Sequence, residues 1–260
     1  MIIRSIHNPK VQLIRRLQSS ARTRRSEKSC VIEGIRLVEE AAQSAWLPRS
    51  VFHTNAISTR GMALVNRLAQ TGVPVFQIDE TIMRSISDTQ TPQGVLAVVP
   101  FPQMDLPVSP GFILIPDNIR DPGNLGTMLR TALAAGVELV IIPSGSVDPF
   151  SPKVMRSAMG AHFHLPLRQM AWKEIEQITA DTQTFLAEAS GEISCFHAAL
   201  TRPVTLIIGG EAHGAGAEAR KHADKTIHIP MAGKTESLNA AIAAAILMFE
   251  VVRQREAAND

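Results

Sequence analysis

Cysteine is scarce in this chain of 260 residues, which contains only Cys30 and Cys195. The two lie far apart in the sequence, and neither belongs to a CxxC pair or a histidine-rich stretch of the kind that binds zinc. The sequence therefore predicts neither a disulfide framework nor a metal site. Because unpaired cysteines are typical of reducing compartments, we expect the protein to be cytoplasmic.

Long apolar stretches are also missing. The longest run, residues 240–249, ends at Glu250 and falls short of the roughly 18 residues that a membrane-spanning helix needs. The N-terminus is basic, but no apolar segment of the kind found in a signal peptide follows it. We therefore expect neither a membrane partner nor a cleaved leader.

Aromatic residues make up only 4% of the chain, and tyrosine is absent. This shortage argues against a surface that binds nucleic acid by stacking many bases on aromatic rings. Hydrophobic residues as a whole reach 45%, which is enough for a sizeable core and excludes a disordered chain. The length suggests one large domain or two ordinary ones.

The small net charge of +2 conceals an uneven distribution. Residues 1–28 hold eight of the 26 basic residues and one of the 24 acidic residues, a net charge of +7, so the remainder carries about −5. A basic N-terminal arm of this kind, residues 1–29, suits a polyanionic partner. The alternative is a solvated amphipathic helix followed by a basic loop. If the partner is RNA, the shortage of aromatics favours recognition of a folded RNA through its backbone and shape.

Strands and helices alternate over residues 30–100 and predict a small α/β sandwich. A helix that opens at Asn8-Pro9 and a polar loop at 19–28 precede it. The predicted strands are residues 30–32, 51–53, 73–78 and 94–99. The predicted helices are residues 33–45, 60–70 and 79–86, the last with Asp79 as its N-cap.

Prolines at positions 100, 102, 107 and 110 predict a stiff linker over residues 101–110. A second α/β unit covers residues 111–260. Its apolar runs ILI, LVII and LIIG are typical of strands buried on both faces of a parallel sheet. We expect strands at 112–115, 137–142, 204–208 and 226–229, and helices at 124–135 and 237–256.

The first candidate motif follows the first strand of this second unit. It runs from Asp117-Asn118-Ile119-Arg120 through Asp121-Pro122-Gly123-Asn124 to Arg130. Ligands of open α/β sheets collect beyond the carboxyl ends of the strands, where this turn lies. Asn124 and Arg130 are about 1.7 helical turns apart, and we expect both to face one crevice. The alternative is that Asn124 caps the helix and Arg130 is a surface cation.

The second motif, Gly209-Gly210-Glu211-Ala212-His213-Gly214, directly follows a buried strand. It is not a dinucleotide fingerprint, because Glu211 occupies a required glycine position, and it is not a P-loop, because Ala215 replaces the lysine. Glycines here permit a close backbone approach to a ligand, or simply a tight turn. We expect His213 to be a solvent-facing residue of this turn.

The third motif begins at Ile229-Pro230-Met231 and continues through Gly233 to Ser237-Leu238-Asn239. Pro230 ends a strand, and Ser237 is a good N-cap for the last helix. In the simplest interpretation this is only a capped helix, which packs Ala241, Ala244, Ala245 and Phe249 into a core. Such small residues also suit a close helix interface, either internal or between subunits.

Together and in this order, the three motifs resemble those of the SpoU (TrmH-like) RNA 2′-O-ribose methyltransferases, a branch of the knotted SPOUT superfamily. The segment 147–160 resembles the same family. Asn8-Pro9, Glu33-Gly34 and residues 91–95 resemble its N-terminal substrate-binding domain, which is similar to ribosomal protein L30e. The resemblance thus covers nearly the whole chain.

The resemblance implies a fold and a set of site residues. The expected fold is a C-terminal alpha/beta knot, a deep trefoil knot with a mostly parallel sheet, plus a smaller L30e-like α/β sandwich. Knots are rare, so this expectation rests on the resemblance alone. The implied catalytic residues are Asn124, Arg130, Glu211, Ser237 and Asn239. The resemblance also implies that S-adenosylmethionine binds largely through backbone groups around Gly209, Ile229, Met231 and Leu238.

The role of Arg130 within such a site has two versions. The family resemblance suggests that it acts as the base that deprotonates the ribose hydroxyl. A guanidinium, with a pKa above ~12, almost never loses its proton, so we expect it to hold the adjacent phosphate and stabilise the developing 2′-oxyanion. Two departures from the family pattern are Ala212, where a glycine is usual, and Ala215, where a larger apolar residue is common.

The sequence therefore favours a homodimeric RNA 2′-O-ribose methyltransferase that uses S-adenosylmethionine and acts on ribosomal RNA of the 23S type. A separate L30e-like domain is typical of the members that modify ribosomal RNA. The alternatives are a tRNA methyltransferase and a non-catalytic RNA-binding assembly factor with the same fold. A nucleotide-dependent oxidoreductase is excluded by the missing fingerprint.

Overall fold

The computed structural model of the chain describes residues 1–101, 104–211, 214–235 and 237–259. The chain divides into two compact units. The first unit consists of Met1–Gln103 and Asp148–Phe163, and the second consists of Met104–Val147 and His164–Asp260. The three candidate motifs of the sequence all lie in the second unit, whereas nearly all of the segment 147–160 lies in the first.

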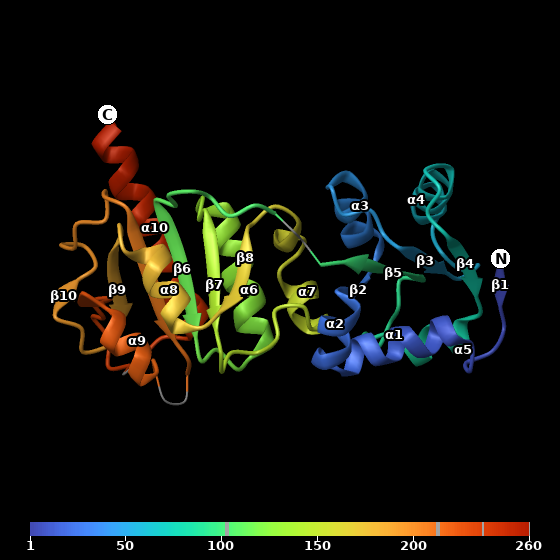
Figure 1. Ribbon diagram of the computed structural model, residues 1–260, viewed down its shortest axis with the longest axis horizontal. Helices are drawn as coiled ribbons and strands as arrows, with labels where there is room; N and C mark the ends of the chain where they lie inside the picture. The colour runs from blue at the N-terminus through green and yellow to red at the C-terminus, as the bar shows by residue number, and fades with distance from the viewer. Residues whose placement is uncertain (102–103, 212–213, 236, 260) are drawn as a thin grey trace. The chain divides into compact units, whose positions relative to one another are not determined.

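The first unit contains a five-stranded sheet with helices on both faces (Figure 1). Its strands are β1 (Ile2–Ile3), β2 (Ser29–Glu33), β3 (Ser50–His53), β4 (Val75–Ile78) and β5 (Val95–Pro100). Its helices are α1 (Pro9–Ser19), α2 (Ala21–Glu27), α3 (Ile35–Gln43), α4 (Thr59–Gln70), α5 (Glu80–Ile86), α7 (Pro152–Ser157) and the 3₁₀ turn η1 (Ala161–Phe163). The prediction of an α/β sandwich here is confirmed.

The sheet order of the first unit is β1-β4-β3-β5-β2, with parallel pairs at β1–β4–β3 and antiparallel pairs at β3–β5–β2. Alternate strand residues face the helices α1 and α5, which form one apolar cluster with the sheet. Val11, Ile14 and Leu17 of α1 are fully buried in this cluster. The N-terminal segment is therefore an integral part of the unit.

The prediction of a loop over residues 19–28 is wrong, because α2 forms there. Ser20 caps this helix by accepting a hydrogen bond from the Thr23 amide at 3.1 Å. Arg24 of α2 is only 4% exposed, and its guanidinium pairs with Asp148 at 2.6 Å. A partner so distant in the sequence cannot be read from local polarity, so the polar segment gave a misleading prediction.

The segment Asp148–Phe163, which lies between two strands of the second unit in sequence, packs within the first unit. It contributes α7 against β2, and Phe150 stacks on Phe101 with ring centroids 4.1 Å apart. His162 is buried in this segment, where its Nε2 lies 2.8 Å from the Pro149 carbonyl oxygen.

The second unit is built on a seven-stranded sheet (Figure 1). Its strands are β6 (Phe112–Asp117), β7 (Leu139–Pro143), β8 (Leu167–Met170), β9 (Gln183–Ala187), β10 (Ile193–Ser194), β11 (Val204–Gly209) and β12 (Lys225–His228). Its helices are α6 (Pro122–Ala134), α8 (Trp172–Thr179), α9 (Ala217–His222) and α10 (Ala240–Asn259).

Every pairing in this sheet is parallel within the part of the chain that the structure describes, which confirms the predicted parallel α/β fold. The strand order is β10-β12-β9-β11-β6-β7-β8, so the order reverses between β11 and β6. One face packs on α8 and α9 through an apolar cluster. On the other, α10 packs against both α6 and β11.

Two details of α10 differ from the predictions. The helix begins at Ala240, and Asn239 rather than Ser237 is its cap, since Asn239 Oδ1 accepts hydrogen bonds from the amides of Ala241 and Ile242. Ala241 and Ala244 are buried as expected, but Phe249 is 49% exposed. Phe249 lies on the outer side of the helix, so its apolar character does not reflect burial within this chain.

None of the helices within the described ranges is both long and apolar enough to cross a membrane.

Candidate active site

A cavity of about 630 Å³ lies at the carboxyl ends of the strands of the second unit. Gly209 at the end of β11 pairs with Asp117 at the end of β6, which is the point where the strand order reverses. Ligands of open α/β sheets bind at such a switch point. The cavity walls come from residues 187–190 after β9, the turn after β11, and the segment that leads from β12 into α10.

Seven of the nine predicted site residues line this cavity, although they come from separate parts of the sequence. All four residues expected to bind a cofactor are among them: Gly209, Ile229, Met231 and Leu238. Three of the expected catalytic residues are also present: Glu211, Ser237 and Asn239. The wall also contains the apolar side chains of Ile208, Ile227 and Leu247, so the lining combines apolar and polar groups.

The glycines of the second motif allow the turn after β11 to fold against its neighbours. A side chain at Gly209 would place its Cβ 2.4 Å from the Ala215 nitrogen, and one at Gly210 would lie 2.1 Å from the Asn118 carbonyl oxygen. Neither position can hold a larger residue without a shift of backbone. Ala215 is buried in the apolar cluster under the turn, where its small side chain fits. Ala212 and His213 lie outside the described residues.

Three predicted catalytic residues form a hydrogen-bonded chain beside the cavity. Asn124 donates from Nδ2 to Oε1 of Glu211, and it accepts at Oδ1 from Nδ2 of Asn239 over 3.0 Å. The three side chains come from α6, from the turn after β11, and from the start of α10. Asn124 is thus held at both ends of its amide, which fixes the orientation of that amide.

The two asparagines of this hydrogen-bonded group, Asn124 and Asn239, lie at the starts of helices, and capping hydrogen bonds fix both helix starts. Asp121, not Asn124, caps α6. Its Oδ1 accepts a hydrogen bond from the backbone N–H of Asn124 at 2.8 Å. Asn239 caps α10 with its oxygen and uses its nitrogen for Asn124. Ser237 is exposed at the cavity, with its carbonyl accepting from the Thr235 hydroxyl at 3.1 Å.

Arg130 is not part of the hydrogen-bonded group of Glu211, Asn124 and Asn239. It is exposed on α6, does not line the cavity, and forms no hydrogen bond or ion pair with any residue that the structure describes. Six residues rotate a helix by about 600°, so the side chains of Asn124 and Arg130 leave α6 about 120° apart. That both side chains address one crevice, at different depths, therefore stays a prediction.

Several residues of the site were not predicted. Glu188 and Arg220 form an ion pair at the cavity wall. Glu188 follows the carboxyl end of β9, so the rule that located the other motifs could have identified it. Asp117 is buried behind the turn, where loss of solvation raises the pKa of its carboxyl group above the ordinary value. Asp117 opens the first motif, but nothing in the sequence indicated that its carboxyl group would be buried at the end of β6.

The cavity suits an organic ligand of nucleoside size. Its volume falls within the range of about 300–1,000 Å³ that is usual for small-molecule sites, and its lining combines apolar side chains with a few polar groups. Fold and site together define the class of this chain. It is a doubly wound α/β protein with a small-molecule site at the switch point of a parallel sheet.

Comparison with protein families narrows this class. Residues 111–249 match the model of the SpoU rRNA Methylase family, and residues 8–97 match that of the MRM3-like substrate binding domain. The chain therefore belongs to the SpoU rRNA methylase family. The resemblance inferred from the three motifs is confirmed, and both halves of the sequence agree.

Individual relatives cover almost the whole chain. The 23S rRNA (guanosine(2553)-2'-O)-methyltransferase RlmP of Bacillus subtilis is 32% identical and aligns with 96% of this chain and 98% of its own length. The AdoMet-bound rRNA methyltransferase of Sinorhizobium meliloti superposes with a TM-score of 0.86 at 28% identity, covering 98% of each chain.

A third comparison extends the likeness to an enzyme from another organism. The SpoU methyltransferase AviRb of Streptomyces viridochromogenes, solved in complex with AdoMet, superposes with a TM-score of 0.84 at 27% identity. The match covers 96% of this chain and all of the other. Two solved relatives with this fold thus hold S-adenosylmethionine.

Proposed function

We propose that this protein transfers a methyl group from S-adenosylmethionine to the 2′-hydroxyl of a ribose in ribosomal RNA. The observation that carries the proposal is the chain of Glu211, Asn124 and Asn239 beside a ligand-sized cavity at the switch point of the sheet. Membership of the SpoU rRNA methylase family and the AdoMet complexes of two relatives support it.

Residues of the cavity wall would hold S-adenosylmethionine. The backbone at Gly209 is open to a ligand, while Ile229, Met231 and Leu238 provide apolar contacts at the wall. When bound, S-adenosylmethionine would supply an electrophilic methyl group to the ribose 2′-oxygen, with S-adenosylhomocysteine as the leaving group and the hydroxyl proton passing to water. The protein must align the ribose and stabilise charge on its oxygen.

The polar residues divide this task. Asn124 and Asn239 hold the carboxylate of Glu211 in one orientation, so that it can position groups beside the cavity. The hydroxyl of Ser237 is available to the ribose at the cavity wall. Arg130, a permanent cation, holds the adjacent phosphate and stabilises the developing 2′-oxyanion. Its exposure in the free protein suits a residue that binds RNA from solution.

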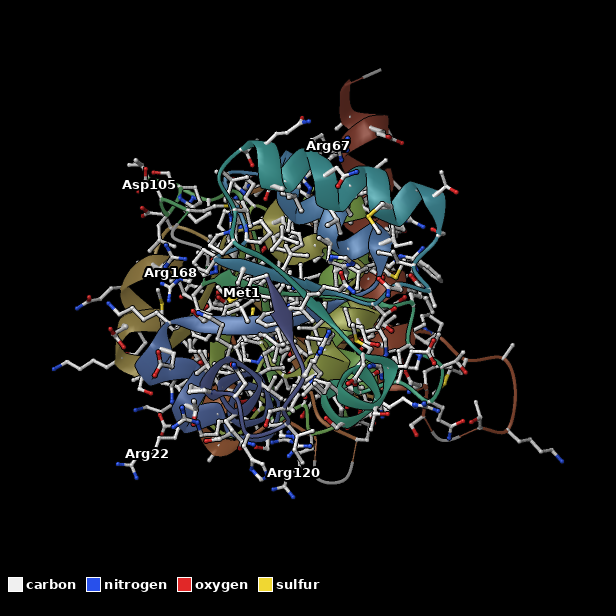
Figure 2. All side chains as sticks on the ribbon, turned by 90° about the vertical axis from the view of Figure 1, so that its right-hand side faces the viewer. Met1, Arg22, Arg67, Asp105, Arg120 and Arg168 are labelled. Atoms are coloured by element: carbon white, nitrogen blue, oxygen red, sulfur yellow. The ribbon has the colours of Figure 1, made fainter. Side chains whose placement is uncertain are left out.

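The first unit fits the task of holding the RNA. Helices α1 and α2 expose a group of cations, among them Arg22, whose side chain projects away from the ribbon (Figure 2). Contacts of this kind with phosphates provide affinity that depends on salt. Ribosomal RNA is the favoured substrate because RlmP is named as a 23S rRNA methyltransferase and matches nearly the full chain.

Three further expectations belong to the same proposal. The knot remains one, supported by the likeness to SpoU methyltransferase structures over both units. A homodimer formed through the second unit would cover Ile242 and Phe249 of α10, which are 51% and 49% exposed. A cytoplasmic location accords with two buried cysteines that are both free thiols.

The test is methyl transfer by an Arg130→Ala variant. We expect transfer to fall by about a hundredfold or more, because charge on the oxyanion loses its stabilising cation, while calorimetry finds unchanged affinity for S-adenosylmethionine. Arg202→Ala is the matched control, since Arg202 is an exposed arginine just before the amino end of β11, away from the cavity.

Each outcome has a definite meaning. Wild-type turnover in Arg130→Ala would overturn the assigned role of Arg130. Transfer to tRNA instead of ribosomal RNA would establish the alternative substrate. Binding of S-adenosylmethionine without transfer to any RNA would support a non-catalytic RNA-binding factor.

A further inference from the structure

The carboxylate of Glu211 needs a separate explanation for its position. Its partners Asn124 and Asn239 lie at the starts of α6 and α10, where capping hydrogen bonds fix them. Glu211 instead belongs to the turn between Gly210 and Gly216, in which residues 212 and 213 are outside the described ranges. A turn holds a side chain in place only if its own ends are fixed.

The far end of this turn is tied to a buried acid. Asp117, the last residue of β6, is 2% exposed. Its Oδ2 accepts a hydrogen bond from the Gly216 amide at 2.7 Å and another from Nδ2 of Asn118 at 3.1 Å. Gly216 has no side chain with which to cap α9, so the carboxylate of Asp117 secures the junction of the turn and this helix.

The near end of the turn rests on the neighbouring residue. Asn118 adopts a left-handed backbone with a φ of 55°, and Gly210 packs so closely on its carbonyl that an added Cβ would lie 2.1 Å away. Ser146 fixes this backbone by donating to the Pro116 carbonyl at 2.9 Å and accepting from the Ile119 amide at 3.1 Å. Both ends of the turn therefore rest on residues 117–118.

We propose that Asp117 is a positioning residue of the methyl-transfer site, whose carboxylate holds Gly216 directly and Gly210 through Asn118, so that Glu211 meets Asn124. The effect on turnover rests on the proposed function. The effect on cofactor affinity does not require catalysis, because Gly209, Gly210 and Gly214 of the same segment line the cavity.

Two substitutions separate the hydrogen bonds of Asp117 from its charge. Asp117→Ala removes both acceptor interactions. Asp117→Asn can keep both hydrogen bonds, because the amide oxygen of the asparagine can take the place of Oδ2. Its NH₂ group then takes the place of Oδ1, and Oδ1 has no hydrogen-bond partner among the described residues. A positioning role therefore predicts rescue by asparagine.

The matched control is Asp224→Ala. Asp224 Oδ2 accepts from the Thr184 amide at 2.8 Å, a bond of the same kind in the same unit. Thr184 lies near the amino end of β9, whereas the cavity is at the carboxyl ends of the strands, and neither residue lines it. This variant measures the cost of removing such a bond away from the site.

The measurements are calorimetric affinity for S-adenosylmethionine, kcat and KM for RNA, and hydrogen exchange at the amides of Gly214 and Gly216. We expect Asp117→Ala to lower both kcat and cofactor affinity about ten- to a hundredfold and to speed exchange at Gly216, since the amide no longer has its charged acceptor. The kcat and cofactor affinity of Asp117→Asn should stay within about threefold of wild type. Asp224→Ala should behave in the same way as Asp117→Asn.

A double variant tests whether Asp117 acts through Glu211. If it does, the kcat of Asp117→Ala combined with Glu211→Gln equals that of Glu211→Gln alone, because the second change finds no further interaction to remove. Additive losses would overturn the inference, as would wild-type behaviour of Asp117→Ala or failure of asparagine to rescue.

Two other outcomes, a variant that does not fold and a failure of the proposed function, can be told apart from a failure of this inference. If Asp117→Ala does not fold, Gly210→Ala disturbs the other end of the turn while the acid is kept, and wild-type kcat and affinity in that variant would refute the positioning role. If the wild-type protein binds S-adenosylmethionine but methylates no RNA, the proposed function fails. The affinity and exchange measurements on Asp117 would then still decide this inference.

Discussion

Asn239 performs two tasks with the two ends of one amide, and substitutions can separate them. Its oxygen caps α10 by accepting from the amides of Ala241 at 2.9 Å and Ile242 at 3.2 Å. Its nitrogen donates to Asn124 in the chain that holds Glu211. Asn239→Asp keeps the capping oxygen and removes the donor, whereas Asn239→Ala removes both.

The structure sets the size of each effect. Loss of an N-cap costs about 1 kcal/mol of stability, so Asn239→Ala should be destabilised by that amount, while Asn239→Asp should match wild type because a carboxylate caps equally well. Activity should fall further in Asn239→Asp. In Asn239→Asp, the NH₂ group of Asn124 can donate either to the new carboxylate or to Glu211, but not to both. We expect losses of about fivefold for alanine and at least about tenfold for aspartate.

The assay compares urea midpoints with kcat/KM for methyl transfer in the same preparations. The predicted order of stability is wild type and Asn239→Asp together, then Asn239→Ala, and the predicted order of activity places Asn239→Asp last. If aspartate were as destabilising as alanine, the capping role would be wrong. If aspartate kept wild-type activity, the link from Asn239 to Glu211 would have no part in the reaction.

Three other predictions follow from the first unit. Glutamine in place of four exposed cations of α1 and α2 should weaken RNA binding. The slope of the logarithm of the binding constant against the logarithm of the salt concentration should fall in magnitude by about one for each phosphate that is no longer neutralised. An unchanged slope in filter binding would contradict this. The cations are Lys10, Arg16, Arg22 and Arg25. Asp148→Ala should destabilise the protein by about 3–5 kcal/mol in urea titrations, because it leaves the buried guanidinium of Arg24 unpaired. A cost below about 1 kcal/mol would show that water reaches this guanidinium. Burial lowers the pKa of His162 to about 4, so the native ring stays neutral while the unfolded chain binds a proton below about 6.5. Stability should therefore fall as pH drops from about 6.5 towards 4, and His162→Gln should reduce that slope in urea midpoints measured at about pH 7.5 and 5.

Much of the site could be predicted because its residues follow strand ends. Gly209 and Glu211 come directly after an apolar run, and parallel strands bring such turns to one edge of a sheet. The motif order then identified the family, which a single motif could not have done. The glycines carried further information, since two of them pack too closely on backbone to be replaced.

The remaining features depend on interactions between distant residues. The polar segment of α2 is helical because Ser20 caps it and Arg24 finds Asp148, which lies 124 residues away. The cap of α10 is Asn239 rather than Ser237, although both residue types are good caps, and only the folded structure distinguishes them. The side chains of Asn124 and Arg130 leave α6 about 120° apart, and that both address one crevice stays a prediction.

Methyl transfer to RNA can be measured with the purified protein. Purified protein, labelled S-adenosylmethionine and either total ribosomal RNA or total tRNA would be incubated separately, and the labelled nucleotide would be mapped by nuclease digestion. We predict label as 2′-O-methylribose in ribosomal RNA, absent from tRNA, and reduced by about a hundredfold or more in Arg130→Ala. No label in either RNA, from protein that binds S-adenosylmethionine, would contradict the account.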